Sequence, residues 1–255
     1  MKTESTLPEP ASGWALFLDV DGTLIEIADH PDAVRVEPRV QTILTVLHRT
    51  LDGAIALVSG RPIAALDRLF APLRLAAAGL HGLERRDAAG GRHCTAVRGP
   101  AIEDAVAALG AFARSHPGTL VEDKGLTAAL HVRGAPDAAD AAQRLGAELA
   151  RRHAGQLVLQ PGKMVIELRP PGPDKGATVR AFLAEPPFAG RVPVFVGDDA
   201  TDEVGFAEAN RRGGHSVRVG RAARTEARWR ASTVAALVAW LERLAERADA
   251  CGNAQ

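Results

Sequence analysis

A short apolar run that ends in two closely spaced aspartates, WALFLDVDGTL at residues 14–24, constrains the fold more than any other stretch. The apolar part has the length and character of a buried strand. Asp19 and Asp21 follow it at once, and placing two carboxylates there is costly because like charges repel and each resists desolvation. A bound divalent cation and a phosphorylated substrate would explain that cost. Gly22 then permits a tight turn and a close backbone approach.

Two other interpretations of this motif need to be weighed. Asp-Xaa-Asp-Gly also opens calcium-binding EF-hand loops, but those loops require Gly at the sixth position and Glu at the twelfth. Leu24 and His30 occupy these positions, so the EF-hand interpretation fails. A plain acidic turn stays open if the motif is considered alone.

Three later segments place polar side chains where a strand pattern and a helix pattern meet. They are AIALVSGRP (54–62), PDKGATVRAFL (173–183) and VPVFVGDDATDE (192–203). The first ends a strand at Ser59, and the second puts Lys175 at the beginning of an amphipathic helix. The third ends a strand in an acidic cluster, made of Asp198, Asp199 and Asp202.

Each of these side chains also has an ordinary explanation. Ser59 could be a loop hydroxyl, and the acidic cluster could be a solvated helix cap, since acids favour that end of a helix. Lys175 could be a solvated lysine, although a cation at a helix N-terminus opposes the helix dipole and so indicates an anionic partner. All four motifs in this order, each at a strand–helix junction, favour a phosphatase-type site.

The four motifs resemble those of the haloacid dehalogenase superfamily, whose members are mostly Mg²⁺-dependent phosphatases. The resemblance implies that Asp19 is the nucleophile, which forms an aspartyl-phosphate, and that Asp21 is the general acid and then the base. Ser59 and Lys175 would hold the transferring phosphoryl oxygens. The implied Mg²⁺ ligands are the Asp19 side chain, the Asp21 backbone carbonyl and Asp198, with Asp202 and Asp199 orienting metal-bound waters. Mn²⁺ and Co²⁺ share such oxygen-rich sites, so the choice of metal stays open.

Four further stretches resemble the trehalose-6-phosphate phosphatases within that superfamily. They are AAAGLHGLERR (76–86), VEDKGLTAALHVR (121–133), GKMVIELRP (162–170) and GDDATDE (197–203). The resemblance extends from about Trp14 to about Glu246 and implies a cap domain that holds the sugar. The chain departs from the family at Val132, where members often carry Tyr, and it contains no Tyr at all.

The candidate substrate-binding residues follow from this resemblance: Gly60, Arg61, His81, Glu122, Lys124, Arg133, Lys163 and Glu167. Lys163 and Glu167 are four residues apart in a strand-like segment, so we expect them on one face. Alternating charges also mark an ordinary solvated sheet face, and His81 could equally be a structural turn histidine. The role of His131 stays open.

The order of the elements predicts an α/β fold: a haloacid dehalogenase-like, doubly wound parallel-sheet core with a smaller α+β cap inserted in it. Strands are expected near 14–19, 53–58, 75–79, 192–196 and 215–219, and helices near 38–50, 62–70, 174–185, 200–210 and 232–247. The last helix has an apolar stripe of Val234, Leu237, Val238, Leu241 and Leu244. A helix–strand–strand pattern that occurs twice predicts the cap at 99–172. The core would then comprise 14–98 and 173–248, with flexible tails at 1–13 and 249–255.

Composition limits the partners and the compartment. Lys plus Arg and Asp plus Glu are equal at 31 each, so no global field attracts nucleic acid or an anionic membrane. Cys94 and Cys251 are far apart, which fits a reducing cytoplasm better than a disulfide framework. Neither a signal peptide nor a membrane span is expected.

The residues leave three functions open. The leading one is hydrolysis of trehalose 6-phosphate to trehalose and phosphate. The second is another sugar-phosphate phosphatase of the same superfamily, acting on sucrose phosphate or mannosyl-phosphoglycerate. The third is a catalytically silent domain that binds a sugar phosphate and regulates a trehalose-phosphate synthase, a partner that the sequence does not show. The complete motif set argues against the silent domain.

Overall fold

The computed structural model describes residues 7–9, 11, 13–27 and 34–252. The chain divides into two compact units, Met1–His93 with Pro173–Gln255, and Cys94–Gly172. Each unit has its own hydrophobic core. No helix in the described ranges is long and apolar enough to cross a membrane.

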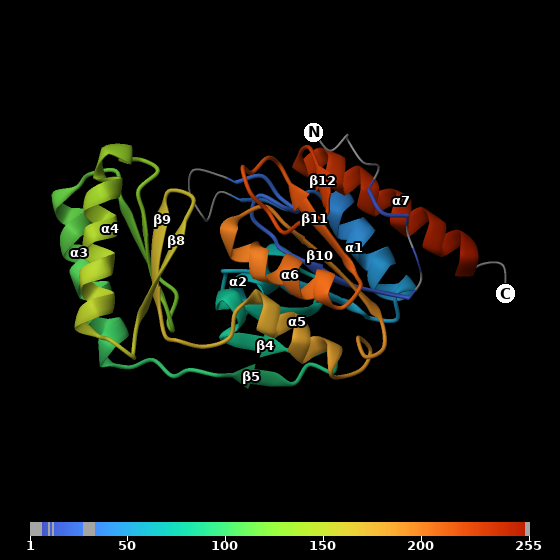
Figure 1. Ribbon diagram of the computed structural model, residues 1–255, viewed down its shortest axis with the longest axis horizontal. Helices are drawn as coiled ribbons and strands as arrows, with labels where there is room; N and C mark the ends of the chain where they lie inside the picture. The colour runs from blue at the N-terminus through green and yellow to red at the C-terminus, as the bar shows by residue number, and fades with distance from the viewer. Residues whose placement is uncertain (1–6, 10, 12, 28–33, 253–255) are drawn as a thin grey trace. The chain divides into compact units, whose positions relative to one another are not determined.

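The first unit is built on an eight-stranded sheet (Figure 1) with the order β12-β11-β10-β1-β2-β3-β4-β5. The strands are β1 (Trp14–Leu18), β2 (Ile55–Val58), β3 (Ala76–Gly79), β4 (Glu84–Arg86), β5 (Arg92–Cys94), β10 (Val192–Gly197), β11 (His215–Val219) and β12 (Trp229–Ala231). The six strands from β12 to β3 pair in parallel, and β4 pairs antiparallel with β3. Strand β1 lies between β10 and β2, so the carboxyl ends of these three strands meet at one edge.

Helices cover both faces of this sheet. They are α1 (Pro38–Thr50), α2 (Ile63–Leu69), α5 (Lys175–Leu183), α6 (Glu203–Arg211) and α7 (Val234–Gly252). Helices α5 and α6 pack together on one face and α1 and α7 on the other (Figure 1), which is the doubly wound arrangement that the sequence predicts. All five residues of the apolar stripe on α7 are buried, so that prediction is confirmed.

Three short strands of this sheet were not predicted: β4, β5 and β12. Each has only three residues and carries charged side chains, so neither length nor alternation marks it in the sequence. In β4, the guanidinium of Arg86 is nevertheless buried, because it donates to the Leu75 carbonyl and pairs with Asp67.

The expected tails fall partly outside the described residues, which leave out 1–6, 10, 12 and 253–255. Among the described N-terminal residues, Leu7 packs against the core and the Pro8 carbonyl accepts a hydrogen bond from Trp240 Nε1 at 3.1 Å, whereas Glu9, Ala11 and Gly13 are exposed. Helix α7 continues to Gly252 and so includes the first residues of the expected C-terminal tail.

The second unit contains two helices and a four-stranded antiparallel sheet, which are the two expected helix–strand–strand repeats. The helices are α3 (Pro100–Ser115) and α4 (Ala139–Arg152), and the strands are β6 (Leu120–Asp123), β7 (Ala128–His131), β8 (Val158–Gly162) and β9 (Val165–Arg169) in the order β6-β7-β9-β8. Leu130 and Ile166 lie in the core beneath the helices. Side chains alternate along a strand, so His131 and Glu167 belong to the opposite face.

One expectation for this sheet is wrong. Lys163 does not share a strand face with Glu167, because it lies in the two-residue turn that joins β8 to β9. Met164, the second residue of this turn, has a positive φ of 57°. Lys163 is exposed, whereas Glu167 is buried.

Candidate active site

The predicted core motifs meet where three neighbouring parallel strands end. Asp19 follows β1, Ser59 follows β2 and Asp198 follows β10. All three side chains are buried. In open α/β sheets this carboxyl edge, next to the point where the strand order reverses, is where ligands bind.

Asp19 receives hydrogen bonds at both carboxylate oxygens. Lys175 Nζ donates to Oδ1 at 2.8 Å, and the Thr23 hydroxyl donates to Oδ2 at 3.0 Å. Burial raises the pKa of Asp19 well above its usual range; Lys175 opposes this shift, and the carboxylates of Asp202 and Asp198 add to it. Thr23 lies within the first motif, but no local pattern in the sequence marks it as a partner of Asp19.

Asp21 is held by Arg61 in a two-pronged ion pair. Arg61 Nε donates to Oδ2 and Nη2 donates to Oδ1, both at 2.7 Å. About a third of the Asp21 side chain, 35%, is exposed.

The position after Asp21 requires glycine. Gly22 has a φ of 79°, and a Cβ at this position would come within 2.4 Å of Asp198 Oδ2. Gly22 therefore lets the Asp198 carboxylate lie directly over the first motif.

Lys175 joins the first motif to the last. It is the first residue of α5, whose N-cap Asp174 accepts a hydrogen bond from the Ala177 amide at 2.7 Å. Its Nζ contacts Asp19 and also donates to Asp202 Oδ1 at 2.6 Å. Burial alone would lower the pKa of Lys175, but the charges of Asp19 and Asp202 outweigh it and the net pKa is raised. Lys175 is therefore a fixed buried cation.

The acidic loop after β10 folds around the Asp202 carboxylate. Its Oδ2 accepts from the backbone amides of Asp198 at 2.9 Å and Asp199 at 3.0 Å. Asp199 caps the short helix η4 (Ala200–Asp202) and accepts from the Thr201 amide. Burial opposes ionisation of Asp199, but Lys175 and the Thr201 amide lower its pKa overall. These bonds orient the loop locally, as acids at a helix start do.

The buried carboxylates fit a divalent cation. Asp19, Asp198 and Asp202 each place one oxygen within 4.8 Å of the others, and all three residues are buried. Lys175 pairs with two of these carboxylates, Asp19 at 2.8 Å and Asp202 at 2.6 Å. Carboxylate oxygens are the ligands that hard cations such as Mg²⁺ prefer.

A backbone loop beside Ser59 adds hydrogen-bond donors. The Arg61 amide donates to Ser59 Oγ at 3.1 Å, and the His81 amide donates to the Ser59 carbonyl at 2.9 Å. A Cβ on Gly60 would lie 2.6 Å from His81 Nε2, so the imidazole ring packs directly against the Gly60 backbone. His81 itself has a positive φ of 57°. Gly60, Arg61 and His81 are thus assembled around Ser59.

The second unit brings together only part of the predicted sugar-binding set. Lys124 Nζ and Glu167 Oε2 form an ion pair at 2.9 Å, with 9% and 7% of their side chains exposed. Glu122 Oε2 lies 2.9 Å from His131 Nε2. Burial opposes ionisation of Glu122, but His131 and Lys124 lower its pKa overall. Arg133 is in the turn after β7, and Lys163 is in the β8–β9 turn.

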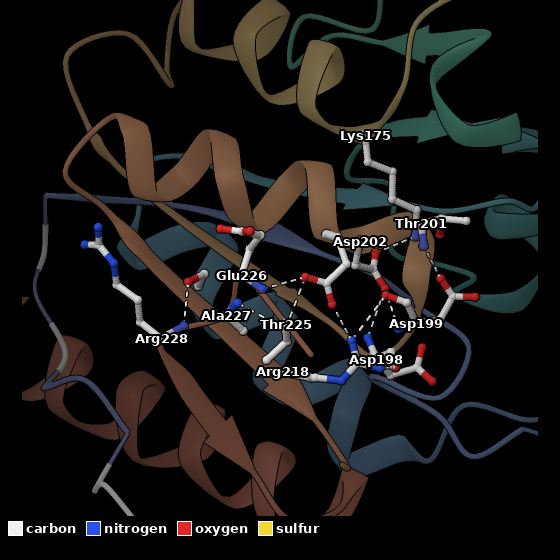
Figure 2. A network of polar contacts seen from close by, with 12 residues as sticks. Lys175, Asp198, Asp199, Thr201, Asp202, Arg218, Thr225, Glu226, Ala227 and Arg228 are labelled. Carbon is white, nitrogen blue, oxygen red and sulfur yellow. Dashed lines mark hydrogen bonds and ion pairs between the residues drawn. The ribbon is translucent and has the colours of Figure 1, made fainter. Parts of the chain in front are cut away.

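A second set of polar contacts lies behind the acidic loop, and none of the sequence motifs includes it. Figure 2 shows Arg218 of β11 against this loop: its guanidinium donates to the Asp198 carbonyl and pairs with Glu203. The available signal was Arg218 within the strand HSVRV, because an arginine is unusual in a strand that is buried on both faces.

Known proteins resemble this chain over most of its length. Residues 17–235 match the family model described as trehalose-phosphatase. A trehalose-6-phosphate phosphatase of Escherichia coli (strain K12) is 44% identical over 235 residues, which cover 92% of this chain and 88% of that protein.

Solved structures share the fold. The C-terminal domain of a C. albicans trehalose-6-phosphate phosphatase superposes with a TM-score of 0.81 at 23% identity, covering 91% of this chain and 92% of that one. A haloacid dehalogenase-like hydrolase from Bacteroides thetaiotaomicron superposes with a TM-score of 0.63 at 17% identity, covering 90% of this chain and 98% of that one.

Proposed function

The chain belongs to the trehalose-phosphatase family and has the haloacid dehalogenase-like fold, and we propose that it hydrolyses trehalose 6-phosphate to trehalose and phosphate through an aspartyl-phosphate on Asp19. The observation that carries the proposal is the buried contact of Lys175 with both Asp19 and Asp202, at 2.8 and 2.6 Å. This contact joins the first, third and fourth motifs in one buried charged cluster. An ordinary solvated lysine at a helix end would not be buried between two carboxylates.

The proposed chemistry has two displacement steps. A carboxylate oxygen of Asp19 attacks phosphorus and the bond to the sugar oxygen breaks, while Asp21 gives a proton to that oxygen. Water then attacks the phosphoryl group on Asp19, Asp21 takes the proton, and inorganic phosphate leaves with Asp19 restored. The hydrogen bonds of Thr23 and Lys175 to the two Asp19 oxygens support this role, because they fix the direction of the carboxylate.

The phosphoryl oxygens need cations and donors, since an anionic nucleophile approaches an anionic phosphate. We propose that Lys175 and the Ser59 hydroxyl supply them, together with the Gly60 loop, His81 and Arg61. Arg61 would exchange its two bonds to Asp21 for bonds to phosphate when substrate binds. That exchange would release Asp21 for proton transfer, and the partial exposure of Asp21 makes it accessible to substrate.

A bound Mg²⁺ would neutralise charge on the transferring phosphoryl group. Asp19, the Asp21 carbonyl and Asp198 would hold it, and Asp199 and Asp202 would orient its waters. The close spacing of three buried carboxylates supports a cation here, and Mn²⁺ or Co²⁺ are the alternatives that a metal panel must test.

The second unit is proposed to select the sugar. Glu122, Lys124 and Glu167 offer charged donors and acceptors for sugar hydroxyls, and the burial of the Lys124–Glu167 pair sets it apart from a solvated sheet face. Arg133 and Lys163 stay in the proposed set as residues of adjoining turns. An exposed free thiol at Cys94 supports the expected reducing, cytoplasmic location.

The test is phosphate release from a panel of sugar phosphates, with and without Mg²⁺. We expect trehalose 6-phosphate to have the highest kcat/KM and the activity to require the metal. A preference for sucrose phosphate or mannosyl-phosphoglycerate would favour the second function. Tight binding of trehalose 6-phosphate without any phosphate release would favour the silent regulator.

A further inference from the structure

The acidic loop of the active site is held from behind by one buried arginine. Arg218 lies on β11, next to Gly197 of β10 in the parallel register, and only 8% of its side chain is exposed. From this position its guanidinium reaches the loop that follows β10, as Figure 2 shows.

Arg218 and Asp202 form hydrogen bonds to opposite sides of the same peptide group. Arg218 Nη2 donates to the carbonyl of Asp198 at 2.6 Å, and the amide of Asp199 donates to Asp202 Oδ2 at 3.0 Å. That carbonyl and that amide belong to one peptide unit, which is planar, so the two contacts fix its orientation. The amide of Asp198 also donates to Asp202 Oδ2, at 2.9 Å. The backbone on both sides of the Asp198 side chain is therefore held.

The second terminal nitrogen of the Arg218 guanidinium, Nη1, is also held by hydrogen bonds. Arg218 Nη1 pairs with Glu203 Oε1 at 2.7 Å and lies 3.4 Å from the Asp199 carbonyl. Glu203 Oε2 in turn accepts from the Glu226 amide at 2.7 Å and the Thr225 hydroxyl at 3.2 Å. Arg218 is thus tied to the start of α6 and to the loop before β12, and it cannot turn away from the acidic loop without breaking several bonds.

We propose that Arg218 is a positioning residue for metal binding: it holds the Asp198–Asp199 peptide so that the carboxylates of Asp198 and Asp202 face one cation. This inference rests on the proposed function, which places a divalent cation at these carboxylates. Groups that orient metal ligands from outside are typically worth tenfold to a hundredfold in metal affinity or activity.

The test compares Arg218→Met and Arg218→Lys with a matched control, Arg86→Met. Arg86 is also a buried arginine of the same sheet, with a backbone carbonyl bond (to Leu75, 2.7 Å) and an ion pair (to Asp67, 2.8 Å). It lies on β4, away from the strands that carry the carboxylates. Loss of Arg86 should lower stability as loss of Arg218 does, without disturbing the acidic loop.

Two quantities are measured for each variant. The first is the Mg²⁺ concentration that gives half of the maximal rise in Tm in the absence of substrate, and the second is the Mg²⁺ concentration that gives half-maximal phosphate release. For Arg218→Met we expect both concentrations to rise about tenfold to a hundredfold. Arg218→Lys keeps one donor for the Asp198 carbonyl and should lie between wild type and Arg218→Met. In Arg86→Met both Mg²⁺ concentrations should stay within about twofold of the wild-type values, while the Tm without metal falls.

The outcomes separate this inference from the proposed function. Wild-type protein that releases no phosphate at any Mg²⁺ concentration would contradict the proposed function. If the wild type is active and both Arg218 variants need Mg²⁺ concentrations within about twofold of wild type, the positioning role is overturned and the proposed function is not affected. An equal rise in the Arg86 variant would also overturn it, because the effect would then be general destabilisation. If Arg218→Met does not fold, Arg218→Lys decides, with a severalfold rise expected.

Discussion

Arg61 binds both carboxylate oxygens of Asp21 at 2.7 Å, so the side chain proposed as the acid is held by a cation before substrate arrives. The two residues are 40 positions apart and come from the loops after β1 and β2, which are neighbouring strands. A bidentate pair of this kind fixes geometry as well as charge. It aligns the acid next to the loop that is proposed to bind phosphate.

Asp21→Asn should separate the two proposed roles of the site. An amide can still accept a hydrogen bond from Arg61 but cannot protonate a sugar oxygen, so trehalose 6-phosphate turnover should fall by about 10²–10⁴-fold. An aryl phosphate with a good leaving group needs no such proton, and its phosphorylation step should be much less affected. Rapid-quench measurement of that step for both substrates checks this. Equal losses would remove Asp21 from the acid role.

Glu167→Gln should damage sugar selection more than chemistry. The change removes the charge that pairs with Lys124 and should lower kcat/KM for trehalose 6-phosphate by roughly tenfold to more than a hundredfold, about 1–3 kcal/mol for each lost buried hydrogen bond. Hydrolysis of a small aryl phosphate should change little. The control is Asp123→Asn, which weakens an exposed pair with Arg98 and should leave the ratio of the two kcat/KM values as in wild type. An unchanged ratio in Glu167→Gln would place sugar selection elsewhere.

Divalent metal should stabilise the folded protein through the carboxylate cluster. A ligand that binds only the folded state adds about 2.7 kcal/mol at a hundred times its Kd, so Mg²⁺ should raise Tm and EDTA should abolish turnover. Asp198→Asn should remove most of the rise in Tm. Asp87→Asn, which alters a carboxylate of the β4–β5 turn, should keep it. A full rise in Tm with Asp198→Asn would argue that the cation binds elsewhere.

Glu208 should contribute stability that depends on pH. Burial opposes its ionisation, but hydrogen bonds from Arg211, Arg212 and Arg180 outweigh this and lower its pKa to about 2. A group with a lowered folded-state pKa stabilises the protein above its unfolded pKa and loses that effect as pH falls toward 2. Glu208→Gln should therefore be less stable than wild type by about 1–2 kcal/mol at pH 7, given that the arginines are partly exposed.

The difference in Tm between Glu208→Gln and wild type should shrink as pH is lowered from 5 toward 2, because the glutamate of the unfolded chain takes up its proton before the folded one, whose pKa is about 2. Glu148→Gln is the control, since Glu148 forms an exposed pair with Arg152 on α4 and should show a small difference at every pH. A gap for Glu208 that stayed constant with pH would contradict the pKa assignment.

The parts of the fold that the sequence predicted are those fixed by local patterns. Asp19, Ser59 and Asp198 follow apolar strands, so their convergence follows once the strands pair in parallel. The stripe on α7 is likewise visible from its spacing.

The parts that were missed depend on pairing between distant segments. Lys163 was predicted to lie on a strand, but it lies in the turn between β8 and β9. The position of this turn depends on the register of β8 against β9, which local composition does not determine. Arg61 and Asp21 are 40 positions apart, and Arg218 is 20 positions from Asp198, whose carbonyl it binds. No local pattern specifies such partners.

Asp19 is the proposed nucleophile, and Asp19→Asn removes the attacking carboxylate with little change in the size of the side chain. The amide cannot form a phosphoryl-enzyme, while its size and its contacts with Thr23 and Lys175 are largely retained. We predict a folded protein with a Tm close to that of wild type and Mg²⁺-dependent phosphate release from trehalose 6-phosphate below about one ten-thousandth of the wild-type rate. Substantial Mg²⁺-dependent release by the purified, folded variant would show that Asp19 is not the nucleophile.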